Sequence, residues 1–398
     1  MKNAPTRLRN LLSLLLLLLL TAAPAALRAQ TTVIRTMLAD GLTREYRLYV
    51  PAIYTRTTGA VPLLLNLHGY GSNNQEQENY GDFRPIADTA NFLVVHPNGT
   101  IDAANKRNWN TFGPRGSGVD DVAFLSTLID TLARRYRLDL NRVYSTGMSN
   151  GGFMSYELAC QLGNRVAAIA SVTGSMTAGR LAGCTSGRPV PILEIHGTDD
   201  RTVPYPGGTL LQFVAIPTLL NSWVQRNGCS PTPTVTAVPD INTADGCTAE
   251  RSVWAGGRNG SVVEHFRIIG GGHTWPGSAF VVGVTNQDIS ASREIWRFVR
   301  RYRLATLLPT RGAVGPAAPQ LLVLPNPATD LLQLDAGQHL APEGLTVRDA
   351  LGRRVAAPAQ LLPNGRLQVA TAAWPAGLYQ LAVELPNGQV LRQKLLKQ

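Results

Sequence analysis

The chain has 398 residues, 44% of them hydrophobic and 16% charged, so it can bury a sizeable core, and its length predicts two or three structural units. The formal net charge is +11, but the basic residues are scattered, and the densest run is Arg297–Arg303. In that run apolar and basic positions follow helical spacing, so we interpret it as the solvated face of a helix and not as a nucleic-acid or membrane site.

Residues 1–29 have the organisation of an export signal. Basic Lys2, Arg7 and Arg9 precede the apolar run Leu11–Leu20, which is too short to span a bilayer, and small residues follow as far as Ala29. We therefore predict a signal peptide and a secreted, extracellular protein with no integral membrane segment. Attachment to the cell surface is a further option. Without the signal peptide the formal charge is about +7.

Between residues 30 and 304 predicted strands and helices alternate, which favours an α/β fold. Asp40-Gly41 lies between the first two strands and predicts a hairpin. We expect strands at 33–37, 46–50, 62–67, 92–96, 142–145, 166–172, 191–195, 234–238, 251–255 and 262–269. We expect helices at 121–136, 150–162, 209–226, with Pro217 as a kink or break, and 289–303.

The strand 62–67 ends in His68-Gly69-Tyr70-Gly71, a Gly-rich turn that suits an oxyanion hole with an N–H near Tyr70. The alternative is an ordinary loop. Farther on, the polar, Gly-rich stretch 100–118 contains Trp109, which either lines a substrate cleft or pins the loop to the body of the protein.

The stretch Gly147-Met148-Ser149-Asn150-Gly151 lies between a predicted strand and a predicted helix. Gly-x-Ser-x-Gly in this context is the nucleophile elbow of the α/β-hydrolases, with Ser149 as nucleophile and the N–H of Asn150 as an oxyanion donor. We expect glycine at both ends of the motif because a Cβ atom would collide with a neighbouring strand or helix. The alternative is a Gly-rich turn with a capping serine.

Two later turns could complete a catalytic triad. The strand 191–195 is followed by Asp199 and Asp200, and either carboxylate could orient a histidine. The strand 262–269 leads into a Gly-rich loop with His273, where a general base belongs, and with Trp275, which we expect near the substrate pocket.

Four cysteines are present, and none has the spacing of a metal site. In an exported protein they predict disulfides, with nearest-neighbour pairing Cys160–Cys184 and Cys229–Cys247 and two other connectivities open.

Residues 305–319 are rich in Pro, Ala and Gly and predict a linker. Residues 320–398 predict a small all-β sandwich of short strands, at 321–324, 331–334, 345–348, 367–370, 378–383 and 390–395.

Five blocks together resemble secreted esterases of the polyhydroxybutyrate depolymerase and feruloyl esterase group, of the carbohydrate esterase family 1 type. They are Tyr46–Pro51, Leu67–Ser72, Gly147–Gly152, His196–Tyr205 and Gly272–Gly277. The resemblance covers about residues 34–303. It implies Ser149 as nucleophile, His273 as base and, through its His-Gly-Thr-x-Asp pattern, Asp200 as the acid. It also supports both nearest-neighbour disulfides.

The C-terminal blocks Leu324–Asp330, Asp349–Arg353, Trp374–Tyr379 and Lys394–Lys397 are similar to the type A C-terminal sorting domain of the type IX secretion system. The resemblance implies contact with the secretion machinery, passage across an outer membrane and removal of the domain afterwards. A carbohydrate- or polymer-binding β-sandwich is the alternative.

The function expected from these patterns is hydrolysis of carboxylic esters by a Ser-His-Asp triad, without cofactor, metal or nucleic acid. Feruloyl or acetyl esters of polysaccharide are the expected substrates. A polyhydroxybutyrate depolymerase, a serine peptidase on the same fold and, last, an inactive surface binding protein are the alternatives.

Overall fold

The computed structural model describes residues 31–111, 118–208, 212–304, 321–336, 340–362, 365–385 and 390–398. The chain divides into two compact units, Met1–Pro309 and Thr310–Gln398. The expected signal peptide at 1–29 and linker at 305–319 lie outside the described residues.

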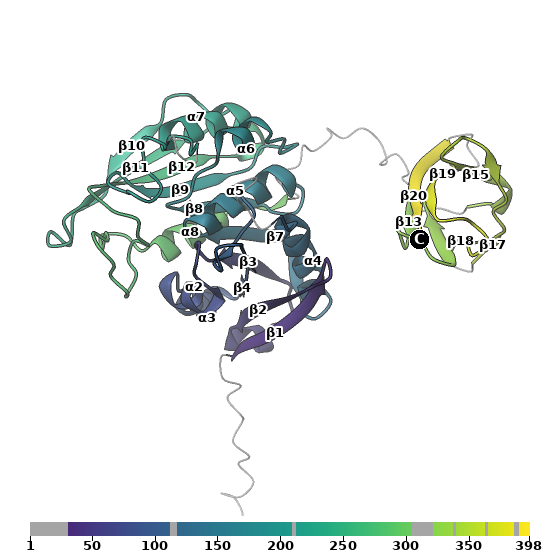
Figure 1. The fold of residues 1–398 in the computed structure, drawn as a ribbon, viewed down its shortest axis with the longest axis horizontal. Coiled ribbons are helices and arrows are strands. Elements are labelled where there is room, and N and C mark those ends of the chain that lie inside the picture. Colours follow the sequence, from purple (N-terminus) through teal and green to yellow (C-terminus); the bar gives the residue numbers. More distant parts are fainter. Residues whose placement is uncertain are drawn as a thin grey trace, which may run out of the picture. The chain divides into compact units, whose positions relative to one another are not determined.

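The first unit is built around one ten-stranded sheet (Figure 1), in the order β1-β2-β4-β3-β7-β8-β9-β12-β11-β10. The strands are β1 (Thr31–Ala39), β2 (Leu42–Val50), β3 (Val61–Leu67), β4 (Leu93–Pro97), β7 (Leu138–Gly147), β8 (Ala168–Val172), β9 (Ile192–Gly197), β10 (Thr234–Ala237), β11 (Thr248–Trp254) and β12 (Val263–Ile269). The six strands from β4 to β12 are parallel, and antiparallel strands extend both edges. This is the predicted α/β fold in its α/β-hydrolase form.

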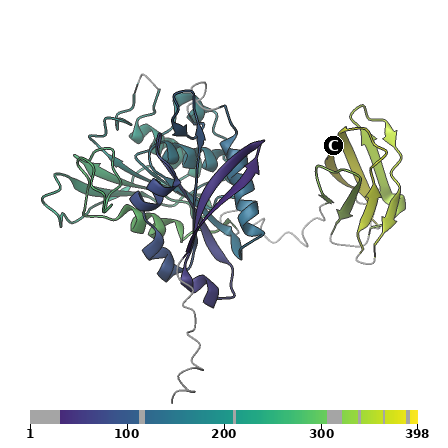
Figure 2. The ribbon, with the colours of Figure 1, turned by 60° about the horizontal axis from the view of Figure 1, so that its bottom comes forward.

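Helices cover both faces of the sheet (Figure 2). α4 (Asp121–Ala133), α5 (Asn150–Gln161) and α7 (Ile216–Asn227) share one core with Leu63 and Leu65 of β3. α3 (Arg84–Ala90) and α8 (Ala291–Val299) share the other core with Leu64. Successive strand residues point to opposite faces, so the apolar run Val61–Leu65 of β3 supplies both cores. Smaller elements are α2 (Asn74–Tyr80), α6 (Ala178–Ala182), β5 (Thr100–Ile101), β6 (Arg107–Asn108) and the 3₁₀ turns Ala52–Arg56 and Arg258–Gly260.

The predicted hairpin is confirmed, because β1 and β2 pair around Asp40 and Gly41, which both have positive φ, 48° and 74°. The helix predicted over 209–226 begins instead at Ile216, so Pro217 lies in its first turn, where its missing N–H costs little. Helix α2 was not predicted because its sequence is polar throughout; the Asn73 side chain caps it by accepting from the N–H groups of Gln75 and Glu76.

One of the two expected disulfides forms. Cys160, at the end of α5, is bonded to Cys184 across a Cα–Cα distance of 5.0 Å. The expectation of Cys229–Cys247 is wrong, since both thiols are free and buried. Cys247 directly precedes β11, while Ser230, next to Cys229, donates to Ala255 just past the other end of that strand. A seven-residue strand is about 23 Å long, and a disulfide needs Cα atoms within about 7 Å.

The second unit consists of two four-stranded antiparallel sheets whose apolar side chains form one core. The first sheet contains β13 (Leu322–Leu324), β14 (Leu331–Asp335), β18 (Leu367–Ala370) and β17 (Ala359–Leu361). The second contains β16 (Arg354–Val355), β15 (Leu345–Asp349), β19 (Gly377–Glu384) and β20 (Val390–Lys397), and a 3₁₀ turn, Pro342–Gly344, precedes β15. Trp374 and Tyr379 lie in this core, 5% exposed each.

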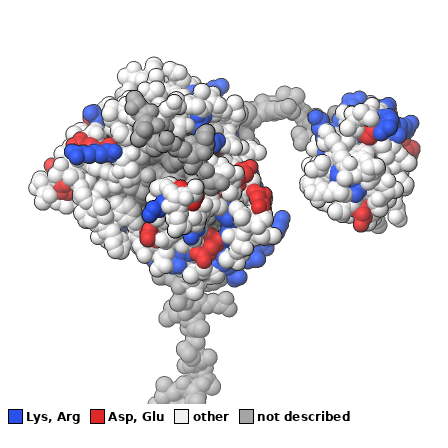
Figure 3. Space-filling model, viewed as in Figure 1, with Lys and Arg blue, Asp and Glu red and all other residues white. Residues whose placement is uncertain are grey.

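Three of the four arginines in the basic run at 297–303 contact carboxylates. Arg297 and Arg301 both contact the buried Glu264, and Arg303 contacts Asp139. On the face shown in Figure 3, basic and acidic residues are interspersed. Helix α8 ends at Val299, so Arg297 lies on the expected helix face, whereas Arg301 and Arg303 follow the helix. In the described part of the chain, no helix combines the length and apolar character needed to cross a bilayer.

Candidate active site

Ser149 occupies a strained turn between β7 and α5. Its backbone has φ 54° and ψ −119°, a combination that residues other than glycine rarely adopt. The N–H of Ser149 donates to the carbonyl of Val172 at the end of β8 (2.8 Å), which ties the turn to the sheet. The strain is therefore maintained by the surrounding structure, as in a nucleophile elbow.

The two glycines of the motif are required by close packing, as predicted. A Cβ atom on Gly151 would lie 2.1 Å from the carbonyl oxygen of Leu67, and one on Gly147 would lie 2.5 Å from the carbonyl carbon of Gly151. Both distances are far below van der Waals contact. Strand β3 and helix α5 thus approach each other across the motif as closely as backbones allow.

The candidate acid and base meet in the structure. The Nδ1 atom of His273 lies 2.7 Å from Oδ2 of Asp200, while Oδ1 of Asp200 accepts from the backbone N–H groups of Thr202 and Val203, each at 2.8 Å. Asp199 is exposed, and its carboxylate accepts from the neighbouring Thr198 hydroxyl. Of the two aspartates left open by position, Asp200 is the one that contacts the histidine.

Topology brings Ser149, Asp200 and His273 to one edge of the sheet. They follow β7, β9 and β12, which belong to the same run of parallel strands, so their carboxyl ends lie together. Among the described residues no hydrogen bond joins the Ser149 hydroxyl to His273. Catalytic hydrogen bonds are often long without substrate and tighten when it binds.

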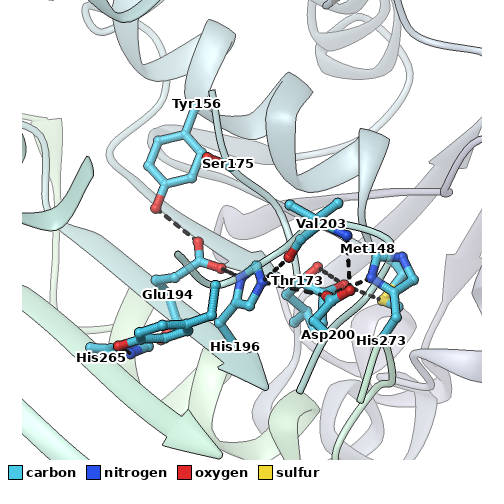
Figure 4. A network of polar contacts seen from close by, with 12 residues as sticks. Met148, Tyr156, Thr173, Ser175, Glu194, His196, Asp200, Val203, His265 and His273 are labelled. Atoms are coloured by element: carbon cyan, nitrogen blue, oxygen red, sulfur yellow. Dashed lines mark hydrogen bonds and ion pairs between the residues drawn. The ribbon is translucent and has the colours of Figure 1, made fainter. Parts of the chain in front are cut away.

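Burial alone would raise the pKa of Asp200. Hydrogen bonds from His196 and His273, and the charges of those rings, outweigh burial and hold the pKa of Asp200 well below its ordinary value. Asp200 is therefore an ionised carboxylate at neutral pH. Figure 4 shows it between the two histidines.

The predicted oxyanion loop lies against the elbow. A Cβ atom built on Gly69 would be 3.5 Å from both the Ser149 Cβ and the Met148 carbonyl oxygen. Within the described residues the backbone N–H groups of Tyr70 and Asn150 have no acceptor, which leaves them free for an oxyanion. The Tyr70 side chain points elsewhere: it is 46% exposed and its hydroxyl donates to Asp102.

Trp109 does not line a substrate cleft, because its ring is fully buried. Its indole N–H donates to the His68 carbonyl (3.0 Å), and its backbone N–H donates to the side-chain oxygen of Asn150 (2.7 Å). Of the two roles considered for Trp109, the structure supports the one in which it pins its loop to the body of the protein, and substrate contact is wrong. Trp109 joins the oxyanion loop to the residue after the nucleophile.

Trp275 is likewise 1% exposed, so the expectation that it contacts substrate is also wrong. Its backbone N–H donates to the Tyr80 hydroxyl, and its indole N–H donates to the Ser292 hydroxyl on α8. Trp275 therefore anchors the loop that carries His273. We expected Trp109 and Trp275 near the substrate pocket because they are large rings close in sequence to candidate site residues. In the structure both rings are buried in the protein interior.

Comparison with known proteins agrees with this geometry. Residues 44–186 match the family model described as Esterase PHB depolymerase. The chain carries a carboxylic ester hydrolase domain. It is 29% identical to a putative esterase of Nocardia uniformis over 66% of this chain and 80% of that protein.

Two fungal relatives match less of their own length. A bifunctional acetylxylan esterase/xylanase of Neocallimastix patriciarum is 28% identical over 66% of this chain and 34% of that protein. A feruloyl esterase C of Emericella nidulans is 31% identical over 48% of this chain and 64% of that protein. The present chain thus spans about a third and just under two thirds of these two relatives. A solved acetyl xylan esterase from Aspergillus awamori aligns with a TM-score of 0.49 and 14% identity, over 68% of this chain and 99% of that chain.

Sequence reasoning missed two residues of the site. His196 and Glu194 lie behind Asp200, and both are fully buried. The available signal was a pair of titratable residues two positions apart in an apolar strand, which places both side chains on one face of the sheet.

Proposed function

We propose that this protein is a serine carboxylic ester hydrolase with Ser149 as nucleophile, His273 as general base and Asp200 as the carboxylate that orients His273. The observation that supports this most directly is the strained Ser149 turn at the same sheet edge as the paired Asp200 and His273. The esterase family match over residues 44–186 supports it independently.

In the proposed reaction His273 removes the proton of Ser149 as the serine oxygen forms a bond to the ester carbonyl carbon. The resulting oxyanion is held by the N–H groups of Tyr70 and Asn150, each worth about 3 kcal/mol in the transition state. Collapse breaks the bond to the alcohol, which leaves with the proton from His273. Water, activated by His273, then releases the acid and restores Ser149.

As substrates we propose acetyl or feruloyl esters carried by polysaccharides, because relatives described as acetylxylan and feruloyl esterases match 66% and 48% of this chain. The alternative substrate is a polyester of the polyhydroxybutyrate type, which the description of the matching family, Esterase PHB depolymerase, favours. Both substrate classes require the same acyl-transfer chemistry, so only a substrate panel separates them.

The test is hydrolysis by the full chain of p-nitrophenyl acetate, methyl ferulate, acetylated xylan and a hydroxybutyrate oligomer, beside Ser149→Ala. We expect turnover that Ser149→Ala removes, and labelling of Ser149 by a fluorophosphonate, read by peptide mass. Turnover that survives in Ser149→Ala would overturn the assignment. Cleavage of peptides but no ester would favour a peptidase, and a folded protein without turnover or labelling would favour an inactive binding protein.

We further propose that residues 320–398 form a β-sandwich sorting domain for secretion, preceded by an export signal at 1–29. The two aromatic residues available for stacking on a sugar or polymer, Trp374 and Tyr379, are buried, and their polar atoms donate to the carbonyls of Ala356 and Pro375. This supports sorting over a binding module. In a host with type IX secretion, the mass of the extracellular protein should show loss of residues 320–398. Retention of those residues would contradict the proposal.

A further inference from the structure

A chain of buried polar groups continues behind Asp200, on the side away from His273 (Figure 4). The His196 Nε2 atom lies 3.4 Å from Oδ2 of Asp200 and 2.8 Å from the carbonyl oxygen of Val203. The His196 Nδ1 atom lies 3.0 Å from a carboxylate oxygen of Glu194, whose other oxygen accepts from the Tyr156 hydroxyl at 2.8 Å. Hydrogen bonds and ion pairs thus connect helix α5 to the candidate acid.

These groups come from elements that also hold the site. Glu194 and His196 are two residues apart in β9, so their side chains project from the same face, the one covered by α5. Both are fully buried, as is Tyr156. Burying a carboxylate and an imidazole costs free energy unless each is paired, and apolar residues of similar size would stabilise a core at least as well. A role in core packing alone therefore does not account for them.

The surroundings of His196 define its protonation state. Both ring nitrogens face acceptor oxygens, so a neutral ring would direct one lone pair at an oxygen, whereas an imidazolium satisfies both contacts. Burial alone would lower the pKa of His196, but its hydrogen bonds to Asp200 and Glu194 raise that pKa to about 9.

The other groups facing this ring are Tyr205, whose ring stacks edge-on at 5.9 Å, and His265 from β12. Burial lowers the pKa of His265 to about 3, so it is neutral, and it contacts the backbone of Glu194 and not Asp200. His196 is therefore the one cation that touches the Asp200 carboxylate from the interior, among the residues that the structure describes.

We propose that His196 is a positioning residue, which as a buried imidazolium between Glu194 and Asp200 fixes the Asp200 carboxylate against His273. This inference rests on the proposed triad. Thr202 and Val203 hold one oxygen of Asp200 through their N–H groups, and His196 holds the oxygen that His273 uses, so the carboxylate cannot rotate. When the Ser149 proton passes to His273, Asp200 stays ionised and His196 keeps both of its protons.

The kinetic test uses the full chain with His196→Gln, Glu194→Gln and the double variant. We expect each single change to lower kcat about tenfold with KM unchanged, well short of the roughly 10⁴-fold loss when an orienting carboxylate is itself neutralised. Loss of the positive charge on His196 should also move the acid limb of the kcat/KM profile to higher pH, because one cation fewer then lies beside Asp200. The double variant should lose no more than either single variant, since the two residues act as a unit.

The matched control is His265→Gln, the same substitution at a buried histidine on the adjacent strand that does not reach Asp200. The His265→Gln variant should have the same acid limb in its kcat/KM profile as the wild type. If His196→Gln lowers stability as much as His265→Gln does but leaves kcat and the acid limb unchanged, the positioning role is wrong and His196 serves packing alone.

A second measurement does not depend on turnover and separates this proposal from the proposed function. In wild-type protein labelled with ¹⁵N-histidine, both ring nitrogens of His196 should carry protons at pH 7. In Glu194→Gln, the variant closest in shape to wild type, His196 should lose one of these two protons. A neutral His196 in the wild type overturns the inference even if esters are hydrolysed. A His196 that is doubly protonated in the wild type and loses a proton in Glu194→Gln supports it even if the ester panel fails.

Discussion

The two halves of the candidate site are held in place by different forces. On the nucleophile side, Ser149 is fixed by backbone contacts so close that Gly147 and Gly151 admit no Cβ atom. On the base side, His273 is fixed by charge, through Asp200 and the buried His196 behind it. The steric constraint acts on the adjacent residues Gly147–Gly151 and therefore appears in the sequence as a short motif. The polar network joins residues that lie far apart in the sequence, from Tyr156 to His273. The two halves should therefore fail in different ways when they are altered.

The largest effect should come from Asp200→Asn, which removes charge from the base side and leaves its shape. An asparagine can present its amide to His273 and favour the wrong tautomer, so we expect kcat/KM to fall about 10⁴-fold, which is about 5.5 kcal/mol of transition-state stabilisation. Steady-state kinetics measures the loss. Asp199→Asn is the matched control, and its kcat/KM should stay within about twofold of wild type, because the Asp199 side chain is exposed and, among the described residues, accepts a hydrogen bond only from the Thr198 hydroxyl. Equal losses in the two variants would mean that Asp200 is not the acid.

Gly151→Ala tests the steric side. The added methyl group would lie 2.1 Å from the Leu67 carbonyl oxygen, so β3 and α5 must separate. We expect the free energy of unfolding to fall by about 4 kcal/mol, and activity to fall with it because the elbow moves. Urea denaturation measures the first quantity.

The control for that variant is Gly179→Ala, at a helical glycine where an added Cβ atom meets nothing within 4 Å. It should stabilise the protein slightly, because alanine favours the helix. A Gly151→Ala protein as stable as Gly179→Ala would show that the close approach of β3 and α5 is not required.

The disulfide should have the next largest effect. It joins Cys160, at the far end of the helix that begins at the elbow, to Cys184, with a sequence separation of 24. Cys160→Ala with Cys184→Ala should lower the free energy of unfolding by about 3 kcal/mol. The comparison is Cys229→Ala with Cys247→Ala, which removes two buried free thiols. Thiol titration of the unfolded, unreduced wild type should find two thiols, and a count of zero would restore the second disulfide.

How much of the site can be predicted from the sequence depends on what holds each residue in place. The elbow and the hairpin at Asp40-Gly41 were predictable because a backbone requirement dictates residue type over a few adjacent positions. The sequence left the role of Trp109 open between two alternatives and predicted the wrong role for Trp275, because their partners, Asn150 and Ser292, lie 41 and 17 positions away. The free Cys229 and Cys247 were missed for a similar reason: nearest-neighbour spacing ignores the extended strand that separates them.

The last effect we predict also distinguishes the buried histidines of the base side. The folded pKa of His196, about 9, lies above its ordinary 6.5, so the folded state retains a proton that the unfolded chain releases. His196 therefore contributes stability fully below about pH 6.5 and loses it as pH rises to about 9, a decline of about 3 kcal/mol. His265 has the opposite sign: with a folded pKa of about 3, its contribution is present above pH 6.5 and is lost only as pH falls towards 3.

Urea denaturation of the full chain at intervals between pH 6 and pH 10 should resolve these two contributions. We expect His196→Gln to flatten the decline above pH 6.5 and His265→Gln to leave it unchanged, although both substitutions lower stability by opening a buried site. A wild-type stability that does not change across this range would mean that His196 is neutral in the folded protein. The base side would then be held by shape, as the nucleophile side is, and the difference between the two halves of the site would disappear.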